Sequence, residues 1–289
     1  MTTRQGGVAP ALWQDRNLKS EIIPMSISGT GSDGTVTISG DTTLSRDMEY
    51  NNLTINTGAV LQTGGYAVHV RRLLTNHGTI RHNGVAGGTG ASGGTALATR
   101  HYGGSTAGGA GRSGAGPGNP GGAANPSKGG TGGAGGQADA SRPGGAAGVV
   151  TAPTVSQGTF NVPPNTITLT DKLGNEVLGG SGGGGGAQTT SGASGNGGSG
   201  GGVIMIAATS ILNSGTIEAN GGAGGNAAGS GDELGGGGGG GGGWIVLVYN
   251  IIQDYGTLQA LGGALGLQDE GGVNGVAGSN GTVLQVQLQ

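Results

Sequence analysis

Few side chains in this sequence have the chemistry of an active site. There are no cysteines, which excludes thiol nucleophiles, disulfides and cysteine-ligated metals. The histidines are His69, His77, His82 and His101. His77 and His82 flank one turn, but a metal centre would need a third ligand held rigidly beside them. We therefore expect solvated loop histidines, no metal site and no cofactor.

Two pairs of acidic residues, Asp232-Glu233 and Asp269-Glu270, lie in glycine-rich stretches. Catalytic carboxylate pairs lie in clefts with aromatic residues nearby, and the sequence places no aromatic residue beside these pairs. The residues before Asp232 faintly resemble a calcium-binding β-roll repeat, but their register does not fit that motif. We interpret the pairs as solubilising loop tips and expect that the protein is not an enzyme.

The best candidates for recognition lie within a glycine-rich tract. Arg100, His101 and Tyr102 form its richest group of side chains, and Arg112 follows further along. On a scaffold of glycine such side chains must point outwards, and exposed Tyr, His and Arg suit binding. The sequence therefore predicts surface recognition by these residues, with incidental solvent exposure as the alternative.

Composition excludes several other classes of protein. Glycine accounts for 76 of 289 residues, against a usual share of about 7%. The net charge is -3 and no basic stripe occurs, so we expect no nucleic-acid partner. Glycine-rich matches to nucleotide-binding loops arise from composition alone, without a βαβ frame. No apolar run reaches the roughly 18 residues of a membrane span, and the first residues lack the apolar core of a secretory signal.

A short repeat indicates how the chain is organised. The pattern Asn or Asp, any residue, Gly, a small residue and an aliphatic residue begins at Asn56, Asn76, Asn213 and Asp254. Short apolar runs precede the last three copies and are typical of strands. Asn and Gly tolerate positive φ, so Asn-x-Gly indicates a turn. The spacing from Asn56 to Asn76 suits one turn of a β-solenoid, in which stacked strand–turn–strand units, here called rungs, bury their apolar faces.

The glycine tracts carry a three-residue register. Gly-Gly-x triplets repeat from Gly129 to Gln137 and from Gly221 to Asn226. A period of three belongs to a polyproline-II-type helix, and glycine helices of this kind can pack closely with mutual N–H to carbonyl bonds. A flexible linker is the alternative. We predict an all-β fold of short β-solenoid or sandwich rungs with long glycine-rich loops packed as a polyglycine-II helix bundle.

Composition divides the chain into segments. Trp13, Leu18, Ile22 and Ile23 give the start of the chain the character of an arm that docks on another chain. A Pro-Pro-Asn turn between alternating residues indicates a hairpin in the middle of the chain. The predicted segments are a docking arm (1–25), a β-rung base (26–83), a glycine-rich tract (84–148), an inserted β-hairpin (149–178), a second tract (179–202) and β-rungs with glycine-rich excursions (203–289).

The tracts from Gly129 to Gln137 and from Gly192 to Val203 resemble those of phage tail-fibre adhesins, whose tips pack polyglycine-II helices. The resemblance implies a virion or extracellular location, contact with a host surface receptor, attachment to other virion proteins through the N-terminal region, and a homo-oligomer, a trimer by analogy. In the adhesins, aromatic-rich loops recognise the receptor, whereas here Tyr102 is the main aromatic residue of the tracts. A capsid-decorating or head-fibre protein is therefore an alternative.

Two other classes stay open on the sequence. A secreted ice- or polysaccharide-binding protein could use the regular face of a glycine bundle, although it should carry an export signal. A polysaccharide-degrading β-helix enzyme should carry a groove of carboxylates and aromatic residues, and the sequence is poor in both.

Overall fold

The computed structural model describes residues 27–124, 127–151, 177–189, 191–229 and 233–288, and all regular elements in these ranges are β-strands. The prediction of an all-β fold is confirmed. One parallel sheet contains, in this order, β1 (Thr35–Ile38), β3 (Met48–Ile55), β5 (Val68–Asn76), β7 (Val203–Asn213), β9 (Trp244–Asp254) and β11 (Thr282–Gln287). The other contains β10 (Thr257–Gln259), β8 (Thr216–Glu218), β6 (Thr79–Arg81), β4 (Val60–Gln62) and β2 (Thr42–Thr43).

Each predicted Asn-x-Gly turn joins a long strand to a short one. β5 ends at Asn76 and β6 begins at Thr79, and the same turn joins β7 to β8 and β9 to β10. The turns stack: a Cβ added to Gly215 would lie 2.1 Å from the carbonyl oxygen of Gly78. Glycine is required in this column because a side chain would collide with the turn beneath it.

A column of polar side chains follows the ends of the long strands. The Asn76 Nδ2 donates to Asn213 Oδ1 at 2.8 Å, and the Asn213 Nδ2 donates to Asp254 Oδ1 at 2.8 Å. The first copy of the repeat does not join this column. Ile55, not Asn56, is in register with Asn76, because the turn after β3 contains two residues more than the turn after β5. The buried Asn76 Oδ1 therefore has no hydrogen-bond partner in the described part of the chain.

The two sheets enclose an aliphatic core. In the short strands, Leu61, Ile80, Ile217 and Leu258 are in register, and the first three are fully buried. The long strands contribute inward-facing residues such as Ile204, Ile206, Ile245 and Leu247. The outer face of β7 and β9 is apolar as well and forms a second cluster around Val203, Met205, Trp244 and Val246. We call this region of strands the base.

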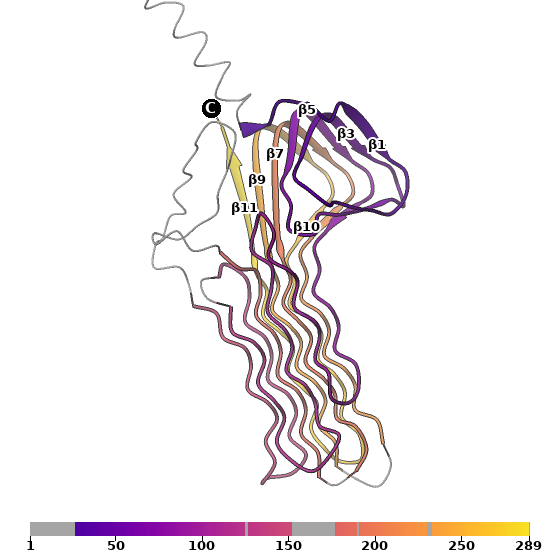
Figure 1. Ribbon diagram of the computed structural model, residues 1–289, viewed down its shortest axis with the longest axis vertical. Helices are drawn as coiled ribbons and strands as arrows, with labels where there is room; N and C mark the ends of the chain where they lie inside the picture. Colours follow the sequence, from indigo (N-terminus) through magenta and orange to yellow (C-terminus); the bar gives the residue numbers. More distant parts are fainter. Residues whose placement is uncertain (1–26, 125–126, 152–176, 190, 230–232, 289) are drawn as a thin grey trace, which may run out of the picture.

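Below the base the chain runs up and down as extended threads, which together form an elongated bundle (Figure 1). Several threads continue directly from strands: 193–202 leads into β7 and 234–243 leads into β9. The threads are 83–89, 93–99, 103–112, 117–124, 127–137, 143–150, 178–188, 193–202, 219–228, 234–243, 260–268 and 272–281.

Thread 234–243 shows how the bundle is held together. The N–H groups of Gly235, Gly238 and Gly241 donate to thread 178–188, at 2.8–2.9 Å. The N–H groups one residue further along, those of Gly236, Gly239 and Gly242, donate to thread 272–281. Those of Gly237, Gly240 and Gly243 donate to thread 219–228. Its carbonyls accept from threads 127–137, 193–202 and 260–268. The three-residue period of the sequence thus corresponds to a three-residue period of hydrogen-bond partners.

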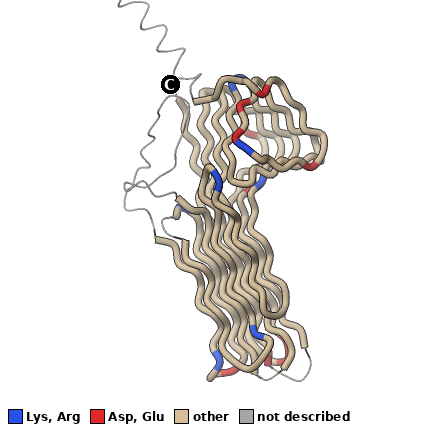
Figure 2. The backbone as a smooth tube through the Cα atoms, in the orientation of Figure 1, with Lys and Arg blue, Asp and Glu red and all other residues tan. Residues whose placement is uncertain are grey.

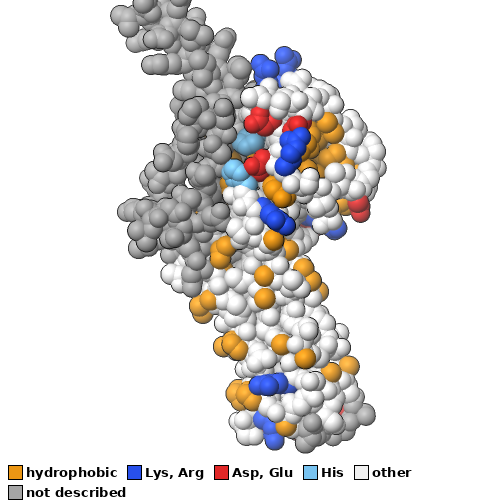
Figure 3. Space-filling view, viewed as in Figure 1, with side chains coloured by type: hydrophobic (Ala, Val, Ile, Leu, Met, Phe, Trp, Pro, Cys, Tyr) orange, Lys and Arg blue, Asp and Glu red, His pale blue; other side chains and the backbone are white. Residues whose placement is uncertain are grey.

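Charged side chains avoid the middle of the bundle. They gather on the base and around the turns at the far ends of the threads (Figure 2). We call these turns, which include residues 113–116 and 138–142, the distal end. Hydrophobic side chains on the face shown in Figure 3 are scattered singly along the threads. No helix in the described ranges is long and apolar enough to cross a membrane.

Candidate functional site

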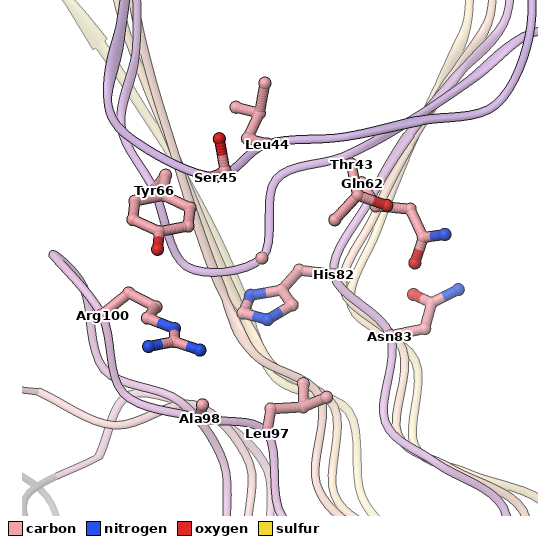
Figure 4. Close-up of a pocket in the computed structure, with 11 residues that line it drawn as sticks. Thr43, Leu44, Ser45, Gln62, Tyr66, His82, Asn83, Leu97, Ala98 and Arg100 are labelled. Atoms are coloured by element: carbon pink, nitrogen blue, oxygen red, sulfur yellow. The ribbon is translucent and has the colours of Figure 1, made fainter.

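A pocket of about 420 Å³ lies where the base meets the first threads (Figure 4). Its volume falls in the range of small-molecule sites. Three parts of the base form it: the end of β2, the end of β4 and the residues after β6. The end of thread 93–99, with Arg100 after it, closes the remaining side. The lining residues are Thr43, Leu44, Ser45, Gln62, Gly64, Tyr66, His82, Asn83, Leu97, Ala98 and Arg100.

Backbone hydrogen bonds fix these segments against one another. The Leu44 N–H donates to the Gln62 carbonyl at 2.9 Å, which ties the end of β2 to the end of β4. The Tyr102 N–H donates to the Gly65 carbonyl at 2.9 Å, which ties the returning segment to the base. Gly64 and Gly65 both have positive φ, a conformation that glycine adopts at little cost and that turns the chain sharply here.

His82 is the most buried polar side chain of the pocket, with 7% of its surface exposed. Its Nδ1 lies 3.1 Å from the Val203 carbonyl, and a carbonyl can only accept, so Nδ1 carries the proton and Nε2 presents a lone pair. Burial lowers the pKa of His82, which keeps the ring neutral near pH 7. Figure 4 shows the ring directed into the pocket, and Nε2 has no partner within the described residues.

Arg100 is the one charged side chain among the lining residues. It is exposed, and its guanidinium forms no hydrogen bond or ion pair with any residue that the structure describes. Figure 4 places the Tyr66 ring and the Arg100 guanidinium on one side of His82, with Gln62 and Asn83 on the other. No carboxylate lines the pocket among the residues described. Its electrostatic character is therefore positive.

The amide groups on the other side differ in their freedom. Both ends of the Asn83 amide have a partner, because its Nδ2 donates to Glu218 Oε1 at 2.6 Å and its Oδ1 accepts from the Asn220 N–H at 2.8 Å. Gln62 has no side-chain partner in the described part of the chain. Asn83 thus stiffens the wall, while the Gln62 amide is available to a ligand.

The structure separates the predicted recognition residues. Arg100 lines the pocket, and His101 beside it pairs through Nδ1 with Asp47 Oδ2 at 2.6 Å. Arg112 lies at the distal end, where its Nε donates to the Pro117 carbonyl at 2.7 Å. The predicted docking residues Trp13, Leu18, Ile22 and Ile23, and most of the predicted hairpin, lie outside the described residues.

The expectation that Tyr102 points outwards is wrong. Only 2% of its surface is exposed, and it packs in the cluster on the outer face of β7 and β9. The reason is that β7 and β9 are apolar on both faces, so the outer face also needs cover, and Tyr102 provides part of it. Burial also raises the pKa of its hydroxyl.

The expectation of solvated loop histidines fails for two of the four. His69 and His82 are both buried, and each bonds through Nδ1 to a backbone carbonyl, that of Ile27 in the case of His69. Sequence reasoning missed His82, Gln62 and Tyr66 as pocket residues. The position of His82 directly after a short strand was the one signal that could have singled it out.

Within the described residues, no group of three or more His, Asp or Glu side chains is arranged to hold a metal ion. Asp269 is used structurally, because its Oδ2 accepts from the Gly229 N–H. Asp232 lies outside the described residues. When the chain is compared with protein families, curated proteins and solved structures, nothing matches. The pocket is lined by polar and apolar side chains, and among the residues described its lining offers no nucleophile hydrogen-bonded to a base.

Proposed function

We propose that this protein is a non-enzymatic structural protein of a phage-type virion surface, a tail-fibre or tail-tip adhesin that contacts the host cell. One observation carries the proposal. Threads almost without side chains project from an apolar base and end in turns that carry charges (Figure 2). Such a molecule holds a few polar groups at a fixed distance from its base, which is the task of a display protein.

The proposal includes a finer view of the architecture. The base is a β-solenoid, in which each rung stacks on the next through parallel pairs such as Ile80 with Ile217. The threads are polyglycine-II helices, since every third N–H of thread 234–243 points to the same neighbour. This view is supported by the match between the period of the donors and three residues per turn.

The charges of the distal end are held in place. Asp139 accepts hydrogen bonds from the Ser141 hydroxyl and N–H and pairs with Arg142. The hydrogen bond from Ser141, with Arg142 nearby, holds the pKa of Asp139 below its ordinary value. The Asp139 carboxylate therefore stays ionised further into the acid range than a free one. Fixed charges of this kind suit recognition of a receptor, because little side-chain freedom is lost on binding.

Attachment is the other half of the proposal. We infer that the N-terminal region, with Trp13, Leu18, Ile22 and Ile23, docks on other virion proteins and that the protein is a homo-oligomer, a trimer by analogy with fibres. The support is compositional: these apolar residues precede the first rung and lie outside the repeat.

Labelling of virions tests the function directly. Antibodies raised against the full-length protein are bound to phage particles from a lysate of a strain that carries the gene, and gold-labelled particles are viewed by electron microscopy. We expect label on the tail. In parallel, excess purified protein should reduce phage adsorption to host cells.

Three outcomes would change the conclusion. Label on the head, with no effect on adsorption, would replace the adhesin by the alternative of a capsid-decorating or head-fibre protein. Unlabelled particles would contradict a virion role altogether. Unlabelled particles together with binding of the purified protein to ice or to a polysaccharide would favour the secreted binding protein.

A further inference from the structure

We propose that the pocket between the base and the first threads binds a carboxylated sugar, such as a uronic acid unit of a surface glycan. That the sugar belongs to a host glycan rests on the proposed function, whereas the chemistry of the ligand rests on the pocket alone. The pocket lies at the base, whereas the charged turns lie at the far end of the threads (Figure 2), so it forms a second site of contact.

The charge of the lining selects an anion. Arg100 has no side-chain partner in the described part of the chain, and no carboxylate among the described residues lines the pocket to neutralise it. A guanidinium presents a planar fork of donors that matches the two oxygens of a carboxylate. The ligand should therefore place a carboxylate beside Arg100.

The buried histidine requires more than an anion. Because the His82 Nδ1–H is used by the Val203 carbonyl, its Nε2 can only accept, and the neutral ring does so at ordinary pH. An anion without protons would leave Nε2 unsatisfied or repel its lone pair. A ligand hydroxyl group would donate to it, so the ligand should carry both a carboxylate and hydroxyls.

The remaining lining fits a sugar ring. Gln62, Ser45 and the Tyr66 hydroxyl can each donate or accept, and none of them has a side-chain partner within the described ranges. The Tyr66 ring, with Leu44 and Leu97, gives the pocket apolar surface against which the C–H face of a sugar can pack. Polar groups that fix orientation on an apolar lining are the usual composition of a ligand site.

Titration of the full-length protein with three probes tests the inference. D-glucuronate, D-glucose and sulfate are added separately, and binding is followed by ligand-observed NMR and calorimetry. We expect D-glucuronate to bind with a Kd below about 10 mM. D-glucose should bind at least tenfold more weakly, and sulfate, which has no proton to donate to His82 Nε2, should not displace D-glucuronate.

Variants assign the binding to the pocket. Arg100→Gln should weaken D-glucuronate binding on the order of 10- to 100-fold, the usual effect of losing a hydrogen bond between charged groups, and should leave the affinity for D-glucose unchanged. Arg72→Gln, at an exposed position of β5 outside the pocket lining, is the matched control and should change neither affinity. Circular dichroism of each variant checks that the fold is retained.

Several results would overturn the inference. Absence of D-glucuronate binding, equal binding of D-glucose, or an unchanged affinity in Arg100→Gln would each do so. Displacement by sulfate would reduce the site to a general anion pocket. Because virion labelling does not depend on these probes, labelled particles without sugar binding would leave the display role standing, and sugar binding without labelled particles would leave only the pocket.

Discussion

The base and the glycine bundle pack segments of the same chain side by side in two different ways. In the base, side chains such as Ile80 and Ile217 fill the space between two sheets. In the bundle, thread 234–243 has no side chain over Gly235–Gly243, and neighbouring backbones fill the space instead. The base is stabilised by apolar burial, and the bundle by hydrogen bonds between backbones at close approach.

The difference between the two regions lies in how far each tolerates change. A core of aliphatic side chains loses stability when a side chain is removed, but it can relax around an added methyl group. The central thread cannot, because a Cβ at Gly238 would lie 2.1 Å from the Gly133 carbonyl oxygen. Ordering glycine is also expensive, about 0.5–1 kcal/mol more per residue than alanine. We infer that the base must form for the threads to be held, while the base does not need the threads in the same way.

The largest expected effect comes from opening the core of the base. Ile217→Ala removes a fully buried side chain from the centre of the column of short strands. We expect a loss of about 2–5 kcal/mol of unfolding free energy, measured by chemical denaturation. Amide exchange should accelerate in the base and in the threads together, because the threads depend on the base.

Leu258→Ala is the matched control for this change. Leu258 lies at the end of the same column and is only partly buried, so its loss should be clearly smaller. Normal protection of the threads in Ile217→Ala, while the base exchanges freely, would contradict the dependence of the bundle on the base.

The next effect tests the bundle alone. Gly238→Ala forces a methyl group against the backbone of thread 127–137, and we expect a loss of about 1–3 kcal/mol or more, since the enclosed thread cannot move aside. Amide exchange should accelerate in the threads and leave β3, β5 and β7 protected. Gly114→Ala is the control: a Cβ there meets nothing within 4 Å, so stability should change by less than about 0.5 kcal/mol.

Equal stability of the two glycine variants would show that the threads are not packed against one another. That outcome would remove the comparison between base and bundle, because the bundle would then have no close backbone contacts to disturb.

The sequence predicted the local chemistry of the chain better than its register. The turns after Asn76, Asn213 and Asp254 were predicted, but the reason differs from the expected one. Among the repeat glycines only Gly58 has positive φ, and the glycines of the three stacked turns are required because a Cβ would collide with the neighbouring backbone. The shift at Asn56 was not predicted, because two added residues in a turn leave no mark on the repeat pattern.

The pocket was beyond prediction for a different reason. Its lining comes from residues 43–45, 62–66, 82–83 and 97–100, which only the stacking of rungs brings together. Arg100 was predicted as a binding residue from the composition of its glycine-rich tract alone. Tyr102 was misjudged, because the need to cover the outer face of β7 and β9 is a property of the assembled sheet.

A smaller effect is expected from the polar column of the base. Asn213→Ala removes the hydrogen bonds to Asn76 and Asp254, at about 0.5–1.5 kcal/mol each. Denaturant titration should show the destabilisation. At low denaturant, the protection of the threads against amide exchange should not change. Asn56→Ala is the control, because Asn56 is exposed and outside the column, and it should be nearly neutral. Equal effects would mean that the column adds nothing to the stacking of rungs.

The smallest expected effect is a pH dependence at the junction of base and bundle. His82 packs against Gly202, where an added Cβ would lie 2.2 Å from Nδ1, so the ring fills the space between β6 and thread 193–202. Burial lowers the pKa of His82 from its ordinary value of 6.5, so the unfolded chain binds this proton more readily than the folded one. The stability that His82 contributes is therefore complete above pH 6.5 and is lost as the pH falls below it.

The pH range in which His82 loses its contribution is separate from the range in which the carboxylates lose theirs. We call these two ranges the upper and the lower window. The hydrogen bond from Arg46 lowers the pKa of Asp33, so the stability from that pair is lost only as the pH falls below 3.8. Between these two values, amide exchange should accelerate first in thread 83–89, which begins beside His82, and only later in the rest of the bundle. His82→Gln, which keeps a donor for the Val203 carbonyl but cannot titrate, should abolish the upper window and retain the lower one. If this variant still loses stability as the pH falls below 6.5, a group other than His82 causes the pH dependence at the junction of base and bundle.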